Sequence, residues 1–358
     1  MASSSSLVLD EVRLLLSRTL FPIFLLAPMS TTVQEQSHLH LVRHVLQESW
    51  SWNRLKKARS NSSTVELVTS YLLSVLAYPF YRSDPEVDLA ATLRVVLSLL
   101  SALSSIWLAR RIRPAFGTRT AKYYLVFEAT QLLATREMTR LDGLSLAVPL
   151  VRIASALLIT PRLPSPLDAD DRPRNASSNK TPSLDTVLGL SLLALASVVL
   201  CPALIALLVP SLWNAWSSGS VDGVQVLGIV GGLIGVEADH PSSSPPLLLS
   251  TLPTTRLSHL FSTSQNFDRS SLFLPYLTLL GPTLLFSTFA FLVDKRCRTL
   301  LGPAIIALLS LHHFPWLGGG GGGGGEEETM KRVRILVLVS STACGVAAAT
   351  SARLVGIM

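Results

Sequence analysis

Long runs of residues without a charge constrain this chain more than any other feature of its sequence. Residues 186–212, 272–293 and 335–352 contain no Asp, Glu, Lys or Arg. A helix rises about 1.5 Å per residue, so roughly 20 apolar residues cross a hydrocarbon core about 30 Å thick. Every backbone amide in that core must be satisfied within its own segment, which favours helices. The runs therefore predict an all-α integral membrane protein.

The composition points the same way. The chain has 358 residues, of which 49% are hydrophobic and 15% are charged, whereas a soluble domain usually carries about 25% charged residues. The alternative is a large soluble protein with buried helices, but such helices rarely exceed about 14 residues without a charge. We expect a polytopic helical bundle with about eight to ten spans of this length, and we leave open whether their number is odd or even.

Basic residues gather at the ends of the apolar runs. The net charge of +7 would suggest a nucleic-acid partner in a soluble protein. Here Lys and Arg cluster at 110–113, 295–298 and 331–334, which is the usual place for charge that flanks a bilayer. No basic surface with interleaved aromatic residues is evident, so the partner that we predict is the lipid bilayer and not nucleic acid. Orientation stays open, because basic segments flank several runs.

Polar segments divide the chain. We expect a first polar loop at 30–64, a basic loop at 110–122, a flexible loop rich in Pro, Asp and Ser at 161–183, and a large loop at 213–271. Within the large loop, residues 224–236 are apolar but too few to span upright, so they would lie in the interface or re-enter the membrane.

A low-complexity insert separates two parts of the chain. Gly318–Gly325 and Glu326–Glu328 form it, and we place its bounds at 318–330. It follows a transmembrane domain at 1–317 and precedes a C-terminal transmembrane segment at 331–358. The glycines are not a phosphate-binding loop, because no Lys-Ser or Lys-Thr follows them.

Metal binding is weakly supported. Cys201, Cys297 and Cys344 are too scattered for a disulfide framework or a metal site, so packing is their simplest role. His40 and His44 lie one helical turn apart, which suits a metal, but no acidic or cysteine partner has a matching spacing. A polar helix face is the simpler interpretation. We predict no metal and no cofactor.

Charged residues inside apolar runs are costly in a membrane and are often functional. Arg94, Glu128 and Arg152 are of this kind, and further charges gather at 136–142. Interhelical salt bridges are one interpretation. The other is a basic pocket for a lipid phosphate, which guanidinium groups bind in a bidentate fork.

Glu35 is a carboxylate expected near a membrane surface, just after the first apolar run. Such a group can act as a general base that takes a proton from a sugar hydroxyl. A solvated loop glutamate fits the pattern equally well. The residues alone leave both interpretations open.

Four stretches carry more information through their shared order than any one of them does alone. Residues 26–39 contain Leu-Ala-Pro, Thr-Val-Gln-Glu and His-Leu, and residues 116–149 contain Phe-Gly, Ala-Thr-Gln, Thr-Arg and Ala-Val-Pro. Residues 213–241 begin with Trp-Asn-Ala-Trp. Residues 274–303 contain Leu-Pro, Leu-Gly, Val-Asp-Lys-Arg and Thr-Leu-Leu-Gly-Pro.

In this order the stretches resemble the dolichyl-phosphate-mannose-dependent mannosyltransferases of the endoplasmic reticulum, glycosyltransferase family 22. The branch that they resemble most is the α-1,6-mannosyltransferase of lipid-linked N-glycan precursor assembly. The resemblance implies a multi-pass membrane glycosyltransferase fold of the GT-C type in the endoplasmic reticulum membrane. It also implies a dolichyl-phosphate-mannose donor and a dolichol-linked oligosaccharide acceptor.

The resemblance implies roles for four residues. Glu35 would be the catalytic base that deprotonates the acceptor hydroxyl, which attacks the anomeric carbon with inversion. Arg140 would either have a structural role or bind the donor phosphate, so that arginine rather than a metal stabilises the departing charge. Gln34 and Trp213 would contact substrate.

Two departures from the family pattern define the alternatives. Gln34 stands where the family carries its first acid, and residues 312–315 read His-His-Phe-Pro where the family has Pro-His-Lys-Glu. These departures favour a diverged, catalytically impaired member. A membrane transporter is the other alternative, but it would need inverted repeats, and the sequence has no such symmetry.

Overall fold

The computed structural model describes residues 2–21, 33–48, 64–131, 139–159, 184–238, 282–293, 295–313 and 326–355. Within these ranges every regular element is a helix, so the all-α prediction is confirmed. The predicted loop at 161–183 and the glycine run lie outside the described residues. The helices, with the short 3₁₀ turn η3, are α1 (Ala2–Phe21), α2 (Val33–Glu48), α4 (Thr64–Ser83), α5 (Leu89–Phe116), α6 (Thr118–Thr130), α8 (Gly143–Leu158), α9 (Leu184–Val199), η3 (Pro202–Leu204), α10 (Ile205–Ser217), α11 (Gly223–Ala238), α15 (Pro282–Val293), α16 (Lys295–His313) and α17 (Glu326–Val355).

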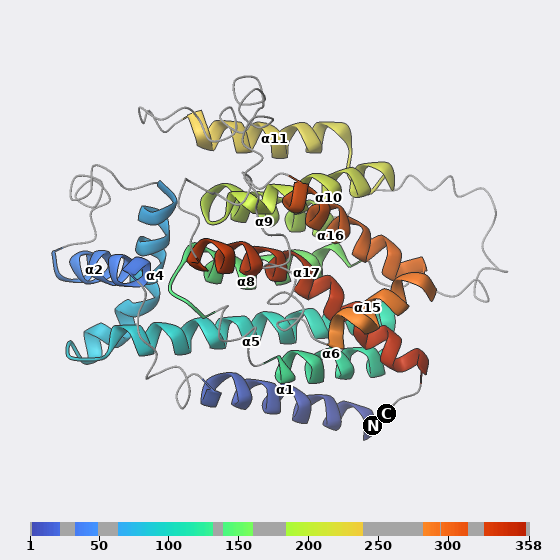
Figure 1. The fold of residues 1–358 in the computed structure, drawn as a ribbon, viewed down its shortest axis with the longest axis horizontal. Coiled ribbons are helices and arrows are strands. Elements are labelled where there is room, and N and C mark those ends of the chain that lie inside the picture. Colours follow the sequence, from blue (N-terminus) through green and yellow to red (C-terminus); the bar gives the residue numbers. More distant parts are fainter. Residues whose placement is uncertain are drawn as a thin grey trace.

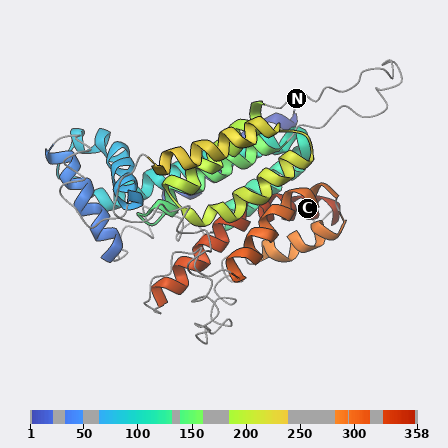
Figure 2. The ribbon, with the colours of Figure 1, turned by 90° about the horizontal axis from the view of Figure 1, so that it is seen from above.

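The helices form a stack. Figure 1 shows α5, α8, α9, α10 and α11 running side by side in chain order, with α1 and α6 beside α5. Seen from above, α2 and α4 form a pair at one end of the stack, while α15, α16 and α17 lie along one side of it (Figure 2). The C-terminal helix α17 packs on α6, α15 and α16, so it is part of the same bundle as the preceding helices.

Local sequence explains where the central helices begin and end. The side chain of Asp88 accepts hydrogen bonds from the backbone amides of Ala90 and Ala91, which is the usual cap for the first turn of a helix. At the other end of α5, Gly117 has φ 100, and it alone separates α5 from α6. A side chain would strain that backbone, so glycine allows this abrupt change of direction.

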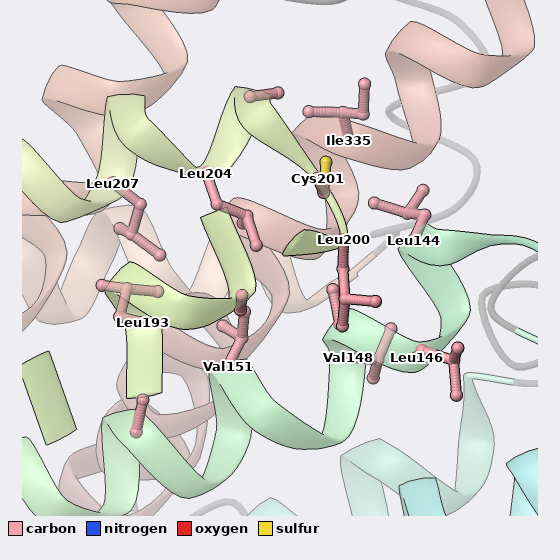
Figure 3. Packing of buried hydrophobic residues seen from close by; sticks show 14 of the residues in the cluster. Leu144, Leu146, Val148, Val151, Leu193, Leu200, Cys201, Leu204, Leu207 and Ile335 are labelled. Carbon is pink, nitrogen blue, oxygen red and sulfur yellow. The ribbon is translucent and has the colours of Figure 1, made fainter. Parts of the chain in front are cut away.

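The larger apolar core lies between α8 and the hairpin formed by α9 and α10. Figure 3 shows leucine and valine side chains of these helices packed together with Ile335 of α17, and further members of the cluster come from α4 and α5. Burying side chains of this size stabilises a fold by about 1.5–3 kcal/mol each when water is the reference. The labelled residues are Leu144, Leu146, Val148, Val151, Leu193, Leu200, Cys201, Leu204, Leu207 and Ile335.

Glycines allow α8 and α9 to approach closely at both ends of their contact. A Cβ on Gly189 would lie 3.0 Å from the carbonyl oxygen of Ala154. A Cβ on Gly143, at the opposite end of α8, would lie 2.6 Å from the carbonyl oxygen of Leu200. The start of each helix therefore meets the end of the other, so the two helices run antiparallel, and small residues permit their close contact.

Replacing Gly143 by alanine should destabilise the protein by about 1–3 kcal/mol, because the added methyl group meets backbone that must move. Thermal unfolding of the purified protein in detergent measures the effect. Gly228→Ala is the matched control, since nothing lies within 4 Å of a Cβ at that position. Equal unfolding temperatures for the two variants would contradict the close approach.

Several sequence predictions need correction. The run at 186–212, expected as one span, is two helices, because the chain turns at residues 200–204. Pro202 explains the break, since proline lacks an amide proton and its ring disfavours helix in the preceding residues. The large loop predicted at 213–271 begins with the end of α10 and then contains α11.

Two shorter predicted loops are also helical in part. The first polar loop, 30–64, contains α2. Its apolar residues recur on one face, where Leu41, Val42 and Val45 are buried, and this periodicity is typical of an amphipathic helix. The basic residues at 110–113 lie on the last turns of α5 and do not form a loop.

The described part of the chain tests the predicted number of membrane spans only in part. Among the described residues α5 is the one helix that is both long and apolar enough to cross a membrane, while α8 and α9 are apolar but have 16 residues each. The bundle of about eight to ten such spans therefore stays a prediction.

Candidate functional site

Two buried ion pairs meet at the turn that precedes α8, and we call this group the turn cluster. One pair reaches the turn from the N-terminal part of the chain and the other from the C-terminal helix. Its members are Glu35 on α2, Arg94 on α5, Leu141 and Asp142 in the turn, and Arg334 on α17.

The first pair joins α2 to α5. Glu35 is 3% exposed, and Nη2 of Arg94 lies 3.4 Å from its Oε1 and 3.3 Å from its Oε2. The backbone amide of Leu141 also donates to Oε1, at 3.1 Å. Charges this far from solvent persist only when they are paired and hydrogen-bonded. One carboxylate thus ties together three segments that are far apart in the sequence.

The second pair joins α17 to the start of α8. Asp142 caps α8 by accepting hydrogen bonds from the amide and hydroxyl of Ser145, at 2.9 and 3.0 Å. Arg334 donates to both oxygens of the same carboxylate, at 2.6 and 3.2 Å. Burial alone would raise the pKa of Asp142, but the charge of Arg334 and the hydrogen bonds of Arg334 and Ser145 together lower it below its ordinary value.

The lowered pKa predicts how acid affects stability. Because the folded pKa of Asp142 lies below the unfolded value of about 3.9, its stabilising effect is present above that pH and is lost as pH falls through the folded pKa. Wild type should therefore unfold at a higher temperature than Asp142→Asn at neutral pH, and the difference should shrink below about pH 4. Unfolding temperatures measured between pH 7 and pH 3 test this. A difference that stays constant over that range would contradict the ion pair.

A second polar group lies between α5, α6 and α8. Arg152 contacts Glu128 at 2.7 Å and also donates to the carbonyl oxygen of Ser101 at 3.1 Å. The hydroxyl of Ser105 donates to the same carboxylate at 3.3 Å. The interhelical salt bridges predicted for Arg94, Glu128 and Arg152 are thus confirmed. The neighbouring charges Arg136 and Glu137 lie outside the described residues.

The histidines of α2 do not form a metal centre with described residues. Nδ1 of His38 lies 2.9 Å from the hydroxyl of Ser70, and both side chains are buried. His40 is exposed. Nowhere in the described ranges do three His, Cys, Asp or Glu side chains gather closely enough to hold a metal ion.

The structure brings two of the predicted site residues into one region. Arg140 is half-buried in the turn that precedes α8. It is followed by Leu141, whose backbone amide donates a hydrogen bond to Glu35. The carbonyl oxygen of Arg140 accepts a hydrogen bond from the amide of Asp142, at 2.9 Å. Gln34 precedes Glu35 on α2, but its side chain lies outside the described part of the chain.

Trp213 is not part of this region. It lies near the end of α10, whereas α2 lies at the opposite end of the stack (Figure 1). Its ring is 65% exposed and meets Trp216 edge to face, with 5.4 Å between the ring centroids. An exposed aromatic pair at a helix end is typical of a membrane–water interface.

Sequence reasoning did not find the partners of these charges. Arg334 was interpreted as a basic residue flanking the apolar run at 335–352, although it is buried against Asp142. Arg94 was singled out, but nothing in the sequence connected it with Glu35, 59 residues earlier. Arg334 stands directly before an apolar run, and this position suits both a charge that flanks a bilayer and a buried ion-pair partner.

Comparisons of the chain with models of known protein families, with curated proteins and with solved structures find no match. Membership of the mannosyltransferase family therefore stays a prediction that rests on the four resembling stretches.

Proposed function

We propose that this chain is a multi-pass protein of the endoplasmic reticulum membrane that transfers mannose between dolichol-linked substrates. The donor is dolichyl-phosphate mannose and the acceptor is a lipid-linked oligosaccharide of N-glycan precursor assembly, with an α-1,6 linkage. The proposal has two parts, a membrane environment and a sugar-transfer site, and different observations support each of them.

The polarity of α5 supports the membrane environment. Its exposed face carries Leu99, Leu103 and Trp107, whereas Arg94, Ser98, Ser101 and Ser105 are buried. A helix at the surface of a water-soluble protein usually turns a polar face to solvent, whereas the exposed face of α5 is apolar and its buried side holds these polar residues together with Leu93, Leu97 and Leu108. In a bilayer, polar and ionisable side chains face the interior of the bundle and small residues line the helix contacts.

Other outer helices show the same apolar exposure. Large hydrophobic side chains are exposed on α9, α10, α11, α15 and α16 as well as on α5. Contiguous apolar patches are small on soluble monomers, and lipid tails are the surroundings that suit faces of this kind. The exposed residues are Leu188, Leu195, Val209, Val224, Leu227, Leu292, Val293, Ile306 and Leu309.

The observation that carries the sugar-transfer part is the contact between Glu35 and Leu141, which are 106 positions apart. Their segments belong to two different stretches of the family resemblance, and the fold joins them in one polar cluster. Arg140 is half-buried beside this contact. A planar guanidinium there suits a lipid phosphate, which it can bind through two parallel hydrogen bonds.

The proposed reaction is a displacement at the anomeric carbon of mannose. A base removes the proton of the acceptor hydroxyl, and that oxygen forms the new glycosidic bond. The bond between the anomeric carbon and the phosphate oxygen breaks, and dolichyl phosphate leaves with the electron pair. Arg140 stabilises the charge that develops on this phosphate.

A second candidate is a diverged member of the same family without transferase activity. The position of Glu35 favours it, because a base must lie within hydrogen-bond reach of the hydroxyl that it deprotonates. Both oxygens of Glu35 already accept hydrogen bonds, and the residue is almost wholly buried.

The lipid-linked oligosaccharide profile of cells lacking this protein separates the two candidates. We expect a precursor short of mannose to accumulate, and we expect the wild-type gene to restore the full-length species. The size of the accumulated intermediate would identify the acceptor. A profile identical to that of normal cells would favour the diverged member without activity.

A further inference from the structure

We infer that Glu35 and Arg94 are positioning residues, which hold α2 against the turn cluster and thereby fix Arg140 for phosphate binding. The inference rests on the proposed function, because it gives the pair a role in the same site. It differs from the sequence prediction for Glu35, in which this carboxylate removes the proton itself.

Glu35 joins three segments of the chain: α2, α5 and the turn that precedes α8. Its carboxylate accepts from the side chain of Arg94 and from the backbone amide of Leu141. A bond to a backbone amide fixes the path of the turn itself. Because the side chains of Glu35 and Arg94 are 4% and 6% exposed, solvent does little to weaken their pairing.

The turn that contains Arg140 is largely buried and held by contacts on both sides of this residue. Thr139 and Leu141 are buried, while Arg140 between them is half-buried. Directly after them, Asp142 is held by Arg334 and caps α8. The turn is thus fixed by one ion pair from α2 and α5 and by another from α17, so the backbone that carries Arg140 is held on both sides. Preorganised donors of this kind are the ones that stabilise a transition state.

A positioning role and a general-base role for Glu35 predict losses of mannose transfer of different size in Glu35→Gln. Glutamine keeps an oxygen that can accept from the Leu141 amide, but it cannot take up a proton at neutral pH. If Glu35 is a positioning residue, this variant should keep mannose transfer within about tenfold of wild type, as expected for the loss of one charged hydrogen bond. Loss of a general base would lower transfer by about 100-fold or more.

The test uses the full-length protein in detergent, with dolichyl-phosphate mannose and the acceptor identified from the cells lacking it. We expect Glu35→Leu and Arg94→Leu each to raise KM for the donor and to lower kcat, because Arg140 loses its support. The double variant should be no worse than either single variant, since the residues act as one unit. His40→Gln is the control on α2, because His40 is exposed and lies outside the turn cluster.

Thermal unfolding of the same variants separates a failure of this inference from a failure of the proposed function. Non-additive losses of unfolding temperature for Glu35→Leu and Arg94→Leu would support the pairing, and additive losses would overturn it. Complete loss of transfer by Glu35→Gln at an unchanged unfolding temperature would also overturn it, in favour of a base. If wild type itself transfers no mannose, the proposed function fails, and the positioning role falls with it even where the unfolding data show the pairing.

Discussion

Replacement of Arg152 by leucine is expected to destabilise the protein by about 3–5 kcal/mol, the usual cost of leaving one member of a buried ion pair alone. Arg152 and Glu128 are 5% and 2% exposed, and the guanidinium also binds the carbonyl oxygen of Ser101. Without Arg152, Glu128 keeps a hydrogen bond from Ser105, but its charge loses the guanidinium that faces it. Unfolding in detergent, followed by heat or denaturant, measures the loss.

Two comparisons show whether burial is the cause. Replacing both Glu128 and Arg152 by leucine should recover most of the stability, because it removes the isolated charge together with its partner. Arg111→Leu breaks a pair with Asp185 in which the two side chains are 36% and 43% exposed, so its effect should be about 0.2–1 kcal/mol. Equal losses for Arg152→Leu and Arg111→Leu would contradict a bundle interior that excludes water.

Replacement of Arg140 by leucine is expected to lower kcat for mannose transfer by about 100–1,000-fold, which is the typical cost of removing one preorganised donor to a developing anion. The physical reason is that Arg140 lies next to Leu141, in a turn that two ion pairs hold. Transfer from dolichyl-phosphate mannose by the purified full-length protein measures the effect.

Arg140→Lys should fall between wild type and Arg140→Leu, because lysine keeps the charge but loses the bidentate geometry. Arg298→Leu is the matched control, since Arg298 is exposed and donates to a carbonyl oxygen at the end of α15. The unfolding temperatures of all three variants, measured alongside, separate a loss of transfer from a loss of fold. A fully active Arg140→Leu would remove this residue from the proposed site.

The sequence predicted the helical class and the residues that carry buried charge. Runs without charge marked α9, α10, α15 and α17, and the cost of an ion in an apolar run identified Arg94, Glu128 and Arg152. These inferences succeed because they depend on single segments. The partner of each charge depends on how segments pack, which is why the Glu35–Arg94 and Asp142–Arg334 contacts had no local signal.

The errors in the fold have local causes. The lack of charge in residues 186–212 predicts one span, although Pro202 is a helix-breaking signal within them. The polar composition of the segment containing α2 predicts a loop, although its apolar residues recur at helical spacing. At the end of α5, basic residues suggested a loop, but arginine favours helix and Gly117 alone makes the turn.

The central claim is that hydrocarbon surrounds the exposed faces of these helices, and spin labels along α5 test it most directly. Single cysteines would replace Leu99, Leu103 and Trp107 on the exposed face of α5, and Asp84 in the exposed turn that precedes α5. The native cysteines are buried, so in the reconstituted full-length protein the label should attach mainly at the new positions. The account predicts that exposed-face labels collide readily with oxygen and poorly with a water-soluble nickel complex, while the label at position 84 collides readily with the nickel complex. Ready collision of the exposed-face labels with the nickel complex would place that face in water and contradict the account.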